Sequence, residues 1–459
     1  MSKHFHRMQT ASKKVVTGWA MYDWANSVYS LVITSTIFPA YYESVTANNL
    51  NNEVKFLGRH FVNTALYNYA LGVAFLIVAL MSPVLSSIAD YKGNKKAFLR
   101  FFCSLGSVSC GLLFFFKGTD TIWIAIVCTM AACIGFWSSL VFYNSYLPEI
   151  AAPQDRDKVS AKGFAMGYIG SVILQLICFV FVFRPGWFGM QADATMPARF
   201  SFLMVGIWWF GFAQITLNIM PKGSPAAFRP EKNIFANGFI ELRKVFNHLK
   251  TLPVLKRFLL AFFFYNMGVQ TIMLVATLFG SKQLGLPTPK LIVSILIIQI
   301  VAIAGAYIMA RLSAKLGNFK TLLSVIVIWI LVCLGAFEIA TISEKGVNAE
   351  MYFYVLAVVV GLVMGGIQSL SRSTYSKLMP DTKDTTSFFS FYDVTEKIAI
   401  VIGMFSFGII EELTGSMKNS VLVIMGFFMI GFIILYFALV KQKQLGMGDN
   451  KAFLTQIIP

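Results

Sequence analysis

Residues 86–96 read SSIADYKGNKK, a short polar stretch that interrupts an otherwise apolar part of the chain. Apolar runs lie on both sides of it, at 66–88 and 97–116. Each run has about the 20 apolar residues that a helix needs to cross the hydrocarbon core of a bilayer. The stretch therefore predicts two membrane-spanning helices joined by a tight polar turn.

The composition of the whole chain agrees with this local pattern. Of its 459 residues, 57% are hydrophobic and 13% are charged, whereas a soluble domain has about 25% charged residues. This excludes an ordinary soluble enzyme, a disordered chain and a nucleic-acid-binding module. The formal net charge of +17 comes from basic residues between the apolar runs, so we expect the partner surface to be the lipid bilayer and not a nucleic acid.

Apolar runs long enough to span a membrane recur along the chain. Twelve are predicted: 18–40, 66–88, 97–116, 121–144, 161–183, 199–220, 256–280, 290–311, 320–341, 351–370, 388–411 and 419–440. The fold class is accordingly an all-α integral membrane protein with twelve transmembrane helices. The longest hydrophilic stretch, 221–255, divides it into an N-terminal six-helix bundle (1–220) and a C-terminal six-helix bundle with a tail (256–459).

The positions of Lys and Arg predict the orientation. Most of the 38 basic residues fall in the N-terminus, the central loop, the tail and every second loop, and basic loops stay in the cytoplasm. Both termini are therefore expected to be cytoplasmic in a multi-pass protein of the cell membrane. In the central loop, Phe239, Leu242, Phe246 and Leu249 recur at helical spacing. They predict an amphipathic helix at the cytoplasmic lipid surface, with a solvated linker as the alternative.

Local matches between the two halves indicate a duplication. Tyr22-Asp23 corresponds to Tyr265-Asn266, and Pro148, after the fourth run, corresponds to Pro380, after the tenth. Two pseudo-symmetric six-helix bundles are therefore predicted.

The quoted turn resembles the loop motif of the major facilitator superfamily. Asp90 is followed by Gly93 and then by the basic residues Lys95 and Lys96. The Asp can cap a helix or pair across the bundle interface, the Gly permits the turn, and the lysines anchor it at the surface. A weaker copy follows the eighth run with Lys315, Gly317 and Lys320, but Ala314 stands where the Asp would be. The resemblance implies the major facilitator fold.

Two further stretches are similar to one family within that superfamily. The first run begins GWAMYDWANS at 18–27, and the tenth and eleventh runs contain GGIQSLSRS at 365–373 and FFSFYDV at 388–394. Together they resemble the autophagy-related vacuolar effluxer family, whose yeast member exports amino acids from the vacuole. The resemblance extends over nearly the whole chain and implies a bacterial-type member that moves a small solute.

Polar residues inside the predicted spans are the candidate functional residues. In the first run, Asp23, Asn26, Ser27, Ser30 and Thr34 form one stripe at α-helical spacing. In the seventh run, Asn266, Gln270, Thr277 and Ser281 form a matching stripe. The family fold would place both stripes on the wall of the central cavity. The alternative for Asp23 is a packing role near the helix start. The neighbouring Trp19, Tyr22 and Trp24 are expected to be interfacial anchors.

Ionisable groups also cluster around the tenth and eleventh runs. Gln368 and Arg372 lie on one helical face, and Asp393 and Lys397 are four residues apart, close enough to pair, with Glu396 near them. Such charges need partners at membrane depth. We expect Arg372 or Lys397 to pair with Asp23 or Asp393 in one state of a gate. The alternative is that Asp393 and Lys397 neutralise each other within one helix while Arg372 extends to the lipid surface.

Other sequence features complete the functional prediction. The six cysteines fall inside apolar runs without metal-ligand spacing, and Gly163–Gly167 and Gly361–Gly365 have the GxxxG spacing of close helix packing. No Walker loop, metal-binding His pair or nucleophile elbow is present, so neither an enzyme nor a cofactor is predicted. The hypothesis is a monomeric secondary transporter of a small molecule such as an amino acid, with protons as the coupling ion. A non-transporting receptor or scaffold on the same fold remains the alternative.

Overall fold

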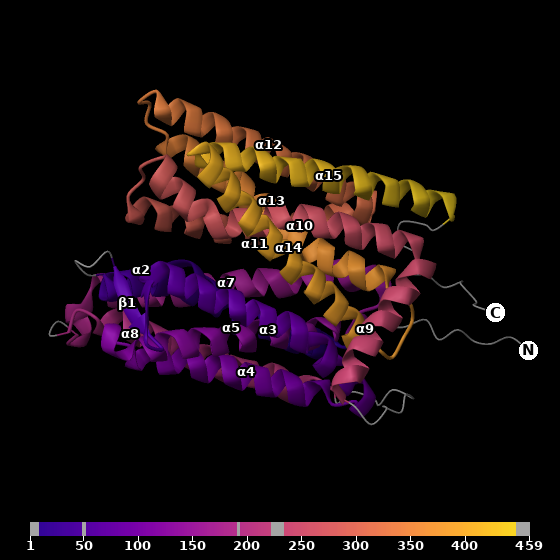
Figure 1. The fold of residues 1–459 in the computed structure, drawn as a ribbon. Helices are drawn as coiled ribbons and strands as arrows, with labels where there is room; N and C mark the ends of the chain where they lie inside the picture. Colours follow the sequence, from indigo (N-terminus) through magenta and orange to yellow (C-terminus); the bar gives the residue numbers. More distant parts are fainter. Residues whose placement is uncertain (1–8, 48–51, 191–192, 222–233, 447–459) are drawn as a thin grey trace, which may run out of the picture. The chain divides into compact units, whose positions relative to one another are not determined.

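A computed structural model describes residues 9–47, 52–190, 193–221 and 234–446, and these residues are almost entirely helical (Figure 1). Ten of their helices are long and apolar enough to cross a membrane, and each coincides with a predicted span. The other two predicted spans are also helical. The first covers α1 (Lys13–Val28), η1 (Tyr29–Thr36) and α2 (Ile37–Thr46), and the eleventh is α14 (Thr385–Thr414).

The contacts within the chain divide it into two compact units. The N-terminal unit comprises Met21–Tyr143 and Met166–Phe239. The C-terminal unit comprises Ile240–Pro459 together with Met1–Ala20 and Asn144–Ala165. The boundaries therefore pass through four helices: α1, α5 (Ile122–Asn144), α7 (Arg156–Phe183) and α9 (Ile234–Thr251).

The N-terminal unit contains a small hairpin in addition to its helices. Strands β1 (Glu53–Phe56) and β2 (Arg59–Val62) pair antiparallel, with Val54 opposite Phe61. The remaining helices of this unit are α3 (Asn63–Lys92), α4 (Lys95–Leu112) and α8 (Met196–Ile219), with short 3-10 turns at Leu113–Phe115, Thr119–Thr121 and Pro185–Phe188. Helices α4 and α8 pack together, and the Trp209 ring lies so close to Gly106 that a side chain there would overlap it.

The C-terminal unit is a bundle of long helices that lie side by side (Figure 1). They are α10 (Pro253–Leu278), α11 (Thr288–Leu316), α12 (Asn318–Glu344), α13 (Glu350–Leu378), α14 and α15 (Met417–Gln444). Gly361 and Gly365 of α13 bring it against α11, because a Cβ at Gly365 would lie 2.2 Å from the carbonyl oxygen of Ala302. The GxxxG prediction for this helix is confirmed. Short segments at Leu147–Ile150 (α6), Pro153–Asp155 (η4) and the start of α7 complete the unit.

Two membrane helices contain π-helical segments that the α-helical spacing did not predict. The first span is π-helical over Tyr29–Thr36, and the seventh is π-helical over Phe279–Gln283 (η6). A π-helix bonds from residue i to i+5 and so changes which residues share a face. The α-helical spacing behind the predicted stripes therefore does not hold at Ser30, Thr34 and Ser281, whose place on a shared face stays a prediction. The physical reason is the changed helical repeat.

The central hydrophilic stretch contains a helix, as predicted. Helix α9 spans Ile234–Thr251. Its buried side chains are Val245 and Leu249, while Phe246 is exposed and contacts Phe391 at 6.5 Å between ring centroids. Phe246 is therefore on the exposed side of the helix, whereas Leu249 packs inward together with Val245. That the exposed side meets lipid stays a prediction. The predicted positions Phe239 and Leu242 lie outside the described side chains.

The turn after α3 has the geometry that its glycine requires. Gly93 has φ of 62°, in the left-handed region, and its N–H bonds to the carbonyls of Ala89 and Asp90. Lys96 Nζ donates to the carbonyl oxygen of Met220 at 2.8 Å, and Lys95 is buried. The expectation that Lys95 would anchor the turn at the surface is therefore wrong. Its side chain is enclosed by the protein and does not reach the surface.

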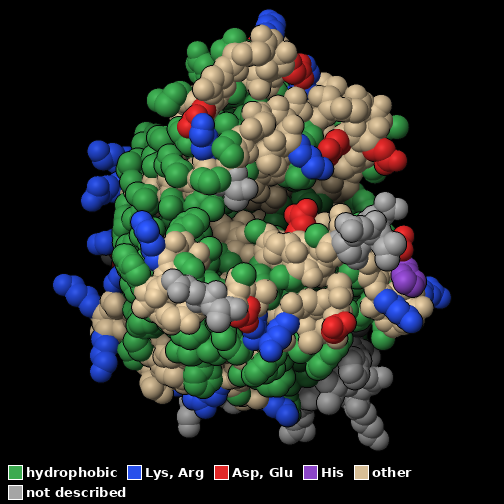
Figure 2. All heavy atoms as spheres, turned by 90° about the vertical axis from the view of Figure 1, so that its left-hand side faces the viewer, with side chains coloured by type: hydrophobic (Ala, Val, Ile, Leu, Met, Phe, Trp, Pro, Cys, Tyr) green, Lys and Arg blue, Asp and Glu red, His purple; other side chains and the backbone are tan. Residues whose placement is uncertain are grey.

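Large apolar side chains are exposed along the spans, and Figure 2 shows hydrophobic side chains over broad areas of the face in view. Leu76, Val355, Phe405 and Ile433 are all more than half exposed. A soluble monomer rarely exposes so much contiguous apolar surface. This surface suits contact with lipid acyl chains.

Candidate functional site

Three ionisable side chains of α14 meet inside the C-terminal unit. Lys397 Nζ donates to Asp393 Oδ1 at 2.7 Å and to Glu396 Oε2 at 3.4 Å. The contact between Asp393 and Lys397 was predicted from their spacing of four residues, and it is confirmed. We call Gln270, Asp393, Glu396 and Lys397 the α14 charge cluster.

Gln270 joins this cluster from a different helix. Its Nε2 donates to Glu396 Oε1 at 3.0 Å, so α10 and α14 are linked through a carboxylate. The side chains of Lys397 and Asp393 are 1% and 6% exposed, whereas that of Glu396 is 17% exposed. Glu396 is therefore the most exposed carboxylate of the cluster.

The charges of the cluster do not balance when every group is ionised. One ammonium faces two carboxylates, so the four side chains of the cluster carry a net charge of −1 when all of them are ionised. A buried ion pair is tolerated because its two charges compensate each other. Burying an additional charge without compensation costs roughly several kcal/mol. The arrangement therefore favours binding of a proton or of a cationic group at the more accessible carboxylate.

Polar side chains of α10 and α13 lie in the same unit. The hydroxyls of Tyr265 and Ser371 share a hydrogen bond of 2.8 Å, and Gln368 Nε2 lies 3.3 Å from Met273 Sδ. Asn266 is buried, and its Nδ2 has no hydrogen-bond partner among the described residues. Leaving a buried donor unpaired costs about 1–3 kcal/mol, which a bound polar solute would recover.

The guanidinium of Arg372 in α13 contacts two aromatic rings and donates three hydrogen bonds. Its carbon Cζ lies 4.1 Å from the ring centroid of Phe164 and 4.9 Å from that of Trp19. Nε donates to Ser160 Oγ at 2.9 Å, Nη2 to the Ser160 carbonyl at 2.9 Å and Nη1 to Asn144 Oδ1 at 3.1 Å. The residue is 3% exposed. The alternative in which Arg372 extends to the lipid surface is therefore wrong.

Asp23 lies in the N-terminal unit, where its best-defined partner is a tyrosine. Tyr143 OH donates to Asp23 Oδ2 at 2.7 Å, and the Tyr22 ring packs on Tyr143 with 5.0 Å between centroids. Asp23 is buried. A Cβ at Gly167 would lie 2.5 Å from Ser27 Oγ, so α7 passes very close to α1 at this point.

The neighbours of Asp23 differ in their surroundings. Asn26 is buried, and its Nδ2 has no partner within the described part of the chain, while Ser27 Oγ donates to Asn26 Oδ1 at 3.5 Å. Trp19 and Tyr22 are completely buried. The expectation that they anchor the helix at the lipid interface is wrong, because Trp19 packs on Arg372 and Tyr22 on Tyr143.

The structure places seven of the ten predicted residues in two sets, and Asn266, Gln368 and Arg372 belong to neither. Gln270, Asp393, Glu396 and Lys397 form one cluster in the C-terminal unit, and Asp23, Asn26 and Ser27 form another set in the N-terminal unit. Sequence reasoning missed Tyr143, although a tyrosine at the end of an apolar run is a suitable hydrogen-bond donor. Among the described residues, no group of three or more His, Cys, Asp or Glu side chains could hold a metal ion.

Solved structures define the class of protein. The fold matches the major facilitator transporter FucP in its outward conformation, with a TM-score of 0.66 and 12% identity over 93% of this chain and 97% of that one. It also matches the human organic anion transporter MFSD10, with a TM-score of 0.67 and 10% identity over 92% and 99% of the two chains. The chain therefore has the major facilitator fold.

Sequence relatives identify the family. The family model described as vacuole effluxer Atg22 like matches residues 11–446, and the chain belongs to this family. It is 32% identical over 424 residues to the MFS-type transporter YxiO of Bacillus subtilis, covering 92% of this chain and 94% of the relative. It is 25% identical over 463 residues to autophagy-related protein 22 of Eremothecium gossypii, covering 91% and 89%. The chain is a transporter of the major facilitator type, not an enzyme.

Proposed function

We propose that the chain is a secondary active transporter that moves a small amino-acid-like solute across the cell membrane by alternating access, coupled to protons. Both termini and the central helix α9 lie on the cytoplasmic side in this proposal. The observation that carries it is the α14 charge cluster, in which two carboxylates share one buried lysine.

Proton coupling follows from the charge of that cluster. Lys397 is closest to Asp393, and Glu396 is the more accessible carboxylate. Taking up a proton at Glu396 removes the excess negative charge, and releasing it restores that charge. A proton-coupled transport cycle needs a group that binds and releases a proton. A proton gradient can drive a conformational change only if protons bind with different affinities to the two conformations.

The solute class follows from the polar groups that each unit offers. Buried amide donors that have no hydrogen-bond partner among the described residues, such as Asn26 Nδ2 and Asn266 Nδ2, suit a carboxylate. The carboxylates of the α14 charge cluster suit an ammonium group. An amino acid carries both groups, and the family is described as vacuole effluxer Atg22 like. These features support a zwitterionic solute.

Uptake into proteoliposomes tests the proposal. The purified full-length chain is reconstituted, a pH gradient is imposed, and accumulation of each of the common amino acids in labelled form is measured. We expect at least one to accumulate, and the Glu396→Gln variant to lose gradient-driven accumulation.

Glu412→Gln is the matched control, because Glu412 is exposed on the same helix. It should transport like the parent protein. Binding of an amino acid without accumulation would instead identify a receptor. Accumulation that does not depend on the pH gradient would exclude proton coupling.

A further inference from the structure

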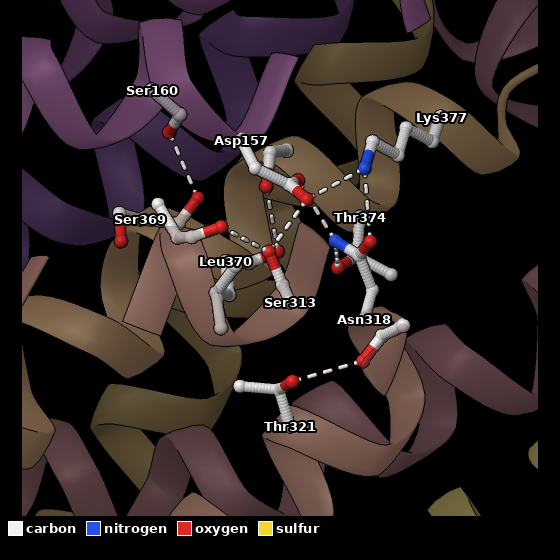
Figure 3. Close-up of polar contacts among 12 residues, drawn as sticks. Asp157, Ser160, Ser313, Asn318, Thr321, Ser369, Leu370, Thr374 and Lys377 are labelled. Atoms are coloured by element: carbon white, nitrogen blue, oxygen red, sulfur yellow. Dashed lines mark hydrogen bonds and ion pairs between the residues drawn. The ribbon is translucent and has the colours of Figure 1, made fainter. Parts of the chain in front are cut away.

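The buried carboxylate at the start of α7 is bound by neighbouring side chains of the C-terminal unit (Figure 3). Asp157 is buried, and its Oδ2 accepts hydrogen bonds from Lys377 Nζ at 2.6 Å and from Ser313 Oγ at 2.8 Å. Its Oδ1 accepts one from Asn318 Nδ2 at 2.8 Å. Both carboxylate oxygens therefore have protein partners, and this cluster joins helices within one unit.

The N-terminal unit contains a feature of another kind, a cavity of about 390 Å³ where α4 ends and α8 begins. Small-molecule sites have volumes of about 300–1,000 Å³. Among the described residues that line this cavity, Asp193 alone is ionisable. Most of the lining is apolar and consists of Phe114, Phe188, Met190, Met196, Phe200 and Leu203. Aromatic rings and flexible methionines suit an aliphatic ligand.

The aromatic walls of the cavity are fixed by their own packing. The Phe181 ring lies 4.6 Å from that of Phe188 and 5.0 Å from that of Phe200, between centroids, and Phe181 is itself buried. Arg199 Cζ lies 4.7 Å from the ring centroid of Phe114, and Arg199 Nε donates to the Phe114 carbonyl oxygen. The walls are therefore formed by side chains that contact each other, as in a pre-formed ligand site.

The charge of Asp193 is already compensated by the protein. Asp193 Oδ2 accepts a hydrogen bond from Arg199 Nη1 at 3.1 Å, and Oδ1 accepts two from Thr195, from N at 2.8 Å and from Oγ1 at 2.6 Å. The bonds from Thr195 lower the pKa of Asp193, and the charges of Arg199 and Lys117 act in the same direction. The carboxylate is therefore ionised and paired, so a cationic ligand would have to compete with Arg199.

Basic residues exceed acidic ones around the cavity. The segments 114–121 and 184–199 that surround it contain three basic and two acidic residues, a net charge of +1, namely Lys117, Arg184, Arg199, Asp120 and Asp193. Arg184 Cζ lies 5.9 Å from the ring centroid of Trp187, which is 74% exposed. Exposed tryptophan beside basic residues at the end of a span is typical of the membrane interface. The cavity therefore lies at the depth of lipid headgroups.

One face of α8 connects the cavity to the apolar surface of the span. Phe200 and Leu203 line the cavity, and Ile207 and Phe210 follow them on the same face at α-helical spacing. Ile207 is 58% exposed and Phe210 is 45% exposed. All four lie in the membrane-spanning helix Met196–Ile219. An aliphatic chain that leaves the cavity can therefore continue along this exposed stripe.

We propose that this cavity binds a phospholipid with one net negative charge. Chain atoms next to the glycerol fill the cavity, the phosphate lies near Lys117, and the rest of one acyl chain lies along Ile207 and Phe210. Burial of the chain against apolar side chains supplies the affinity. The local net charge of +1 complements the headgroup. This lipid site is independent of the transported solute and of its coupling ion.

Photo-crosslinking of a lipid tests the proposal. Phosphatidylglycerol with a diazirine in one acyl chain is added to the purified full-length chain in detergent micelles and irradiated, and the modified peptides are identified by mass spectrometry. We expect crosslinks concentrated in 196–210, suppressed by an excess of unlabelled phosphatidylglycerol and not by the same amount of phosphatidylcholine. Crosslinks spread evenly over the exposed faces of all spans would overturn the proposal. So would equal competition by the two lipids.

Filling the cavity tests its part in binding. We expect Leu203→Trp to reduce the crosslinking about tenfold, because excluding two methylene groups of the chain is sufficient for that loss. Ile215→Trp is the matched control, since it adds the same side chain at an exposed position of α8 outside the stripe, and it should behave like the parent protein. Equal crosslinking in the two variants would contradict the proposal.

A milder variant guards against misfolding of Leu203→Trp. Phe188 is 46% exposed in the turn before α8, so Phe188→Ala removes one wall of the cavity without changing a membrane helix. We expect about fourfold weaker crosslinking, equivalent to the contact with one methylene group. Unfolding temperatures of all variants without lipid show whether each is folded. Crosslinking of a folded Phe188→Ala variant at the parental level would overturn the proposal.

The charge at Lys117 tests the headgroup preference, measured as the ratio of the phosphatidylcholine and phosphatidylglycerol concentrations that halve the crosslinking. We expect Lys117→Gln to lower this ratio about fivefold, the effect of about 1 kcal/mol for one lysine near a lipid surface. Lys92→Gln is the control, because Lys92 is exposed just before the opposite end of α4. An equal change in both variants, or no change in Lys117→Gln, would contradict the placement of the phosphate.

Discussion

Gln270 and Glu396 are 126 positions apart in the chain, yet Gln270 Nε2 lies 3.0 Å from Glu396 Oε1 inside the C-terminal unit. This bond connects α10, the counterpart of the first membrane helix, to the three ionisable side chains of the α14 charge cluster. It places a neutral donor on the most exposed carboxylate of that cluster. The carboxylate is thereby positioned without being neutralised.

Removing the lysine of the α14 charge cluster should destabilise the protein. Lys397→Met removes the ammonium that faces the carboxylates of Asp393 and Glu396, and breaking a buried pair in this way costs about 3–5 kcal/mol. The double variant Asp393→Asn with Lys397→Met should recover most of that loss, because it removes both charges of the pair. Thermal unfolding of the purified variants measures both effects. A double variant no more stable than Lys397→Met would show that the pair is not coupled.

Arg372 should not tolerate lysine. An ammonium cannot reproduce the planar stacking between Trp19 and Phe164 or the three directed hydrogen bonds. We expect Arg372→Lys to lower the free energy of unfolding by about 2 kcal/mol. The exposed Arg311 of α11 provides the comparison, since Arg311→Lys should leave the melting temperature unchanged. Equal effects at both positions would contradict the clamped geometry.

Because α11 and α13 pack closely at Gly365, we expect even alanine at this position to destabilise the protein. In Gly365→Ala the new Cβ would lie 2.2 Å from the Ala302 carbonyl oxygen, so the helices must separate. Overpacking of this kind costs about 1–3 kcal/mol. Gly408→Ala is the control, because nothing lies within 4 Å of that Cβ and alanine favours a helix by about 1 kcal/mol. Gly408→Ala should therefore be neutral or stabilising in the same melting experiment.

Asp23 should be required for gradient-driven transport but not for exchange. Asp23→Asn keeps an acceptor for Tyr143 while removing the titratable group, so the pocket remains and the proton site is lost. We expect accumulation under a pH gradient to disappear and solute exchange between equal concentrations to persist. Tyr143→Phe, which removes the donor alone, should keep gradient-driven accumulation. If Asp23→Asn accumulates solute normally, proton coupling would rest on Glu396 or Asp393 alone.

Contacts within one helix could be predicted from the sequence, and contacts between helices could not. Asp393 and Lys397 are one turn apart, so their pairing depends only on α-helical geometry. The bonds from Gln270 to Glu396 and from Lys377 to Asp157 depend on how helices pack, which no spacing reveals.

Helix spans were predictable because bilayer thickness sets the length of an apolar run. Which face of each helix is buried was less predictable from the sequence. The π-helical segment at Tyr29–Thr36 shifts the register of the first span. In α9, Val245 and not Phe246 turns inward. Asp157 was overlooked because an acid in a first helical turn usually only complements the helix dipole.

The most direct test of proton-coupled transport is the movement of protons caused by solute alone. Proteoliposomes containing the full-length chain and a pH-sensitive dye, with equal pH on both sides, receive an amino acid that the uptake experiment has identified. We predict a pH change inside the vesicles that follows solute entry in the parent protein and is absent in Glu396→Gln. Solute entry without any pH change in the parent protein would contradict the account.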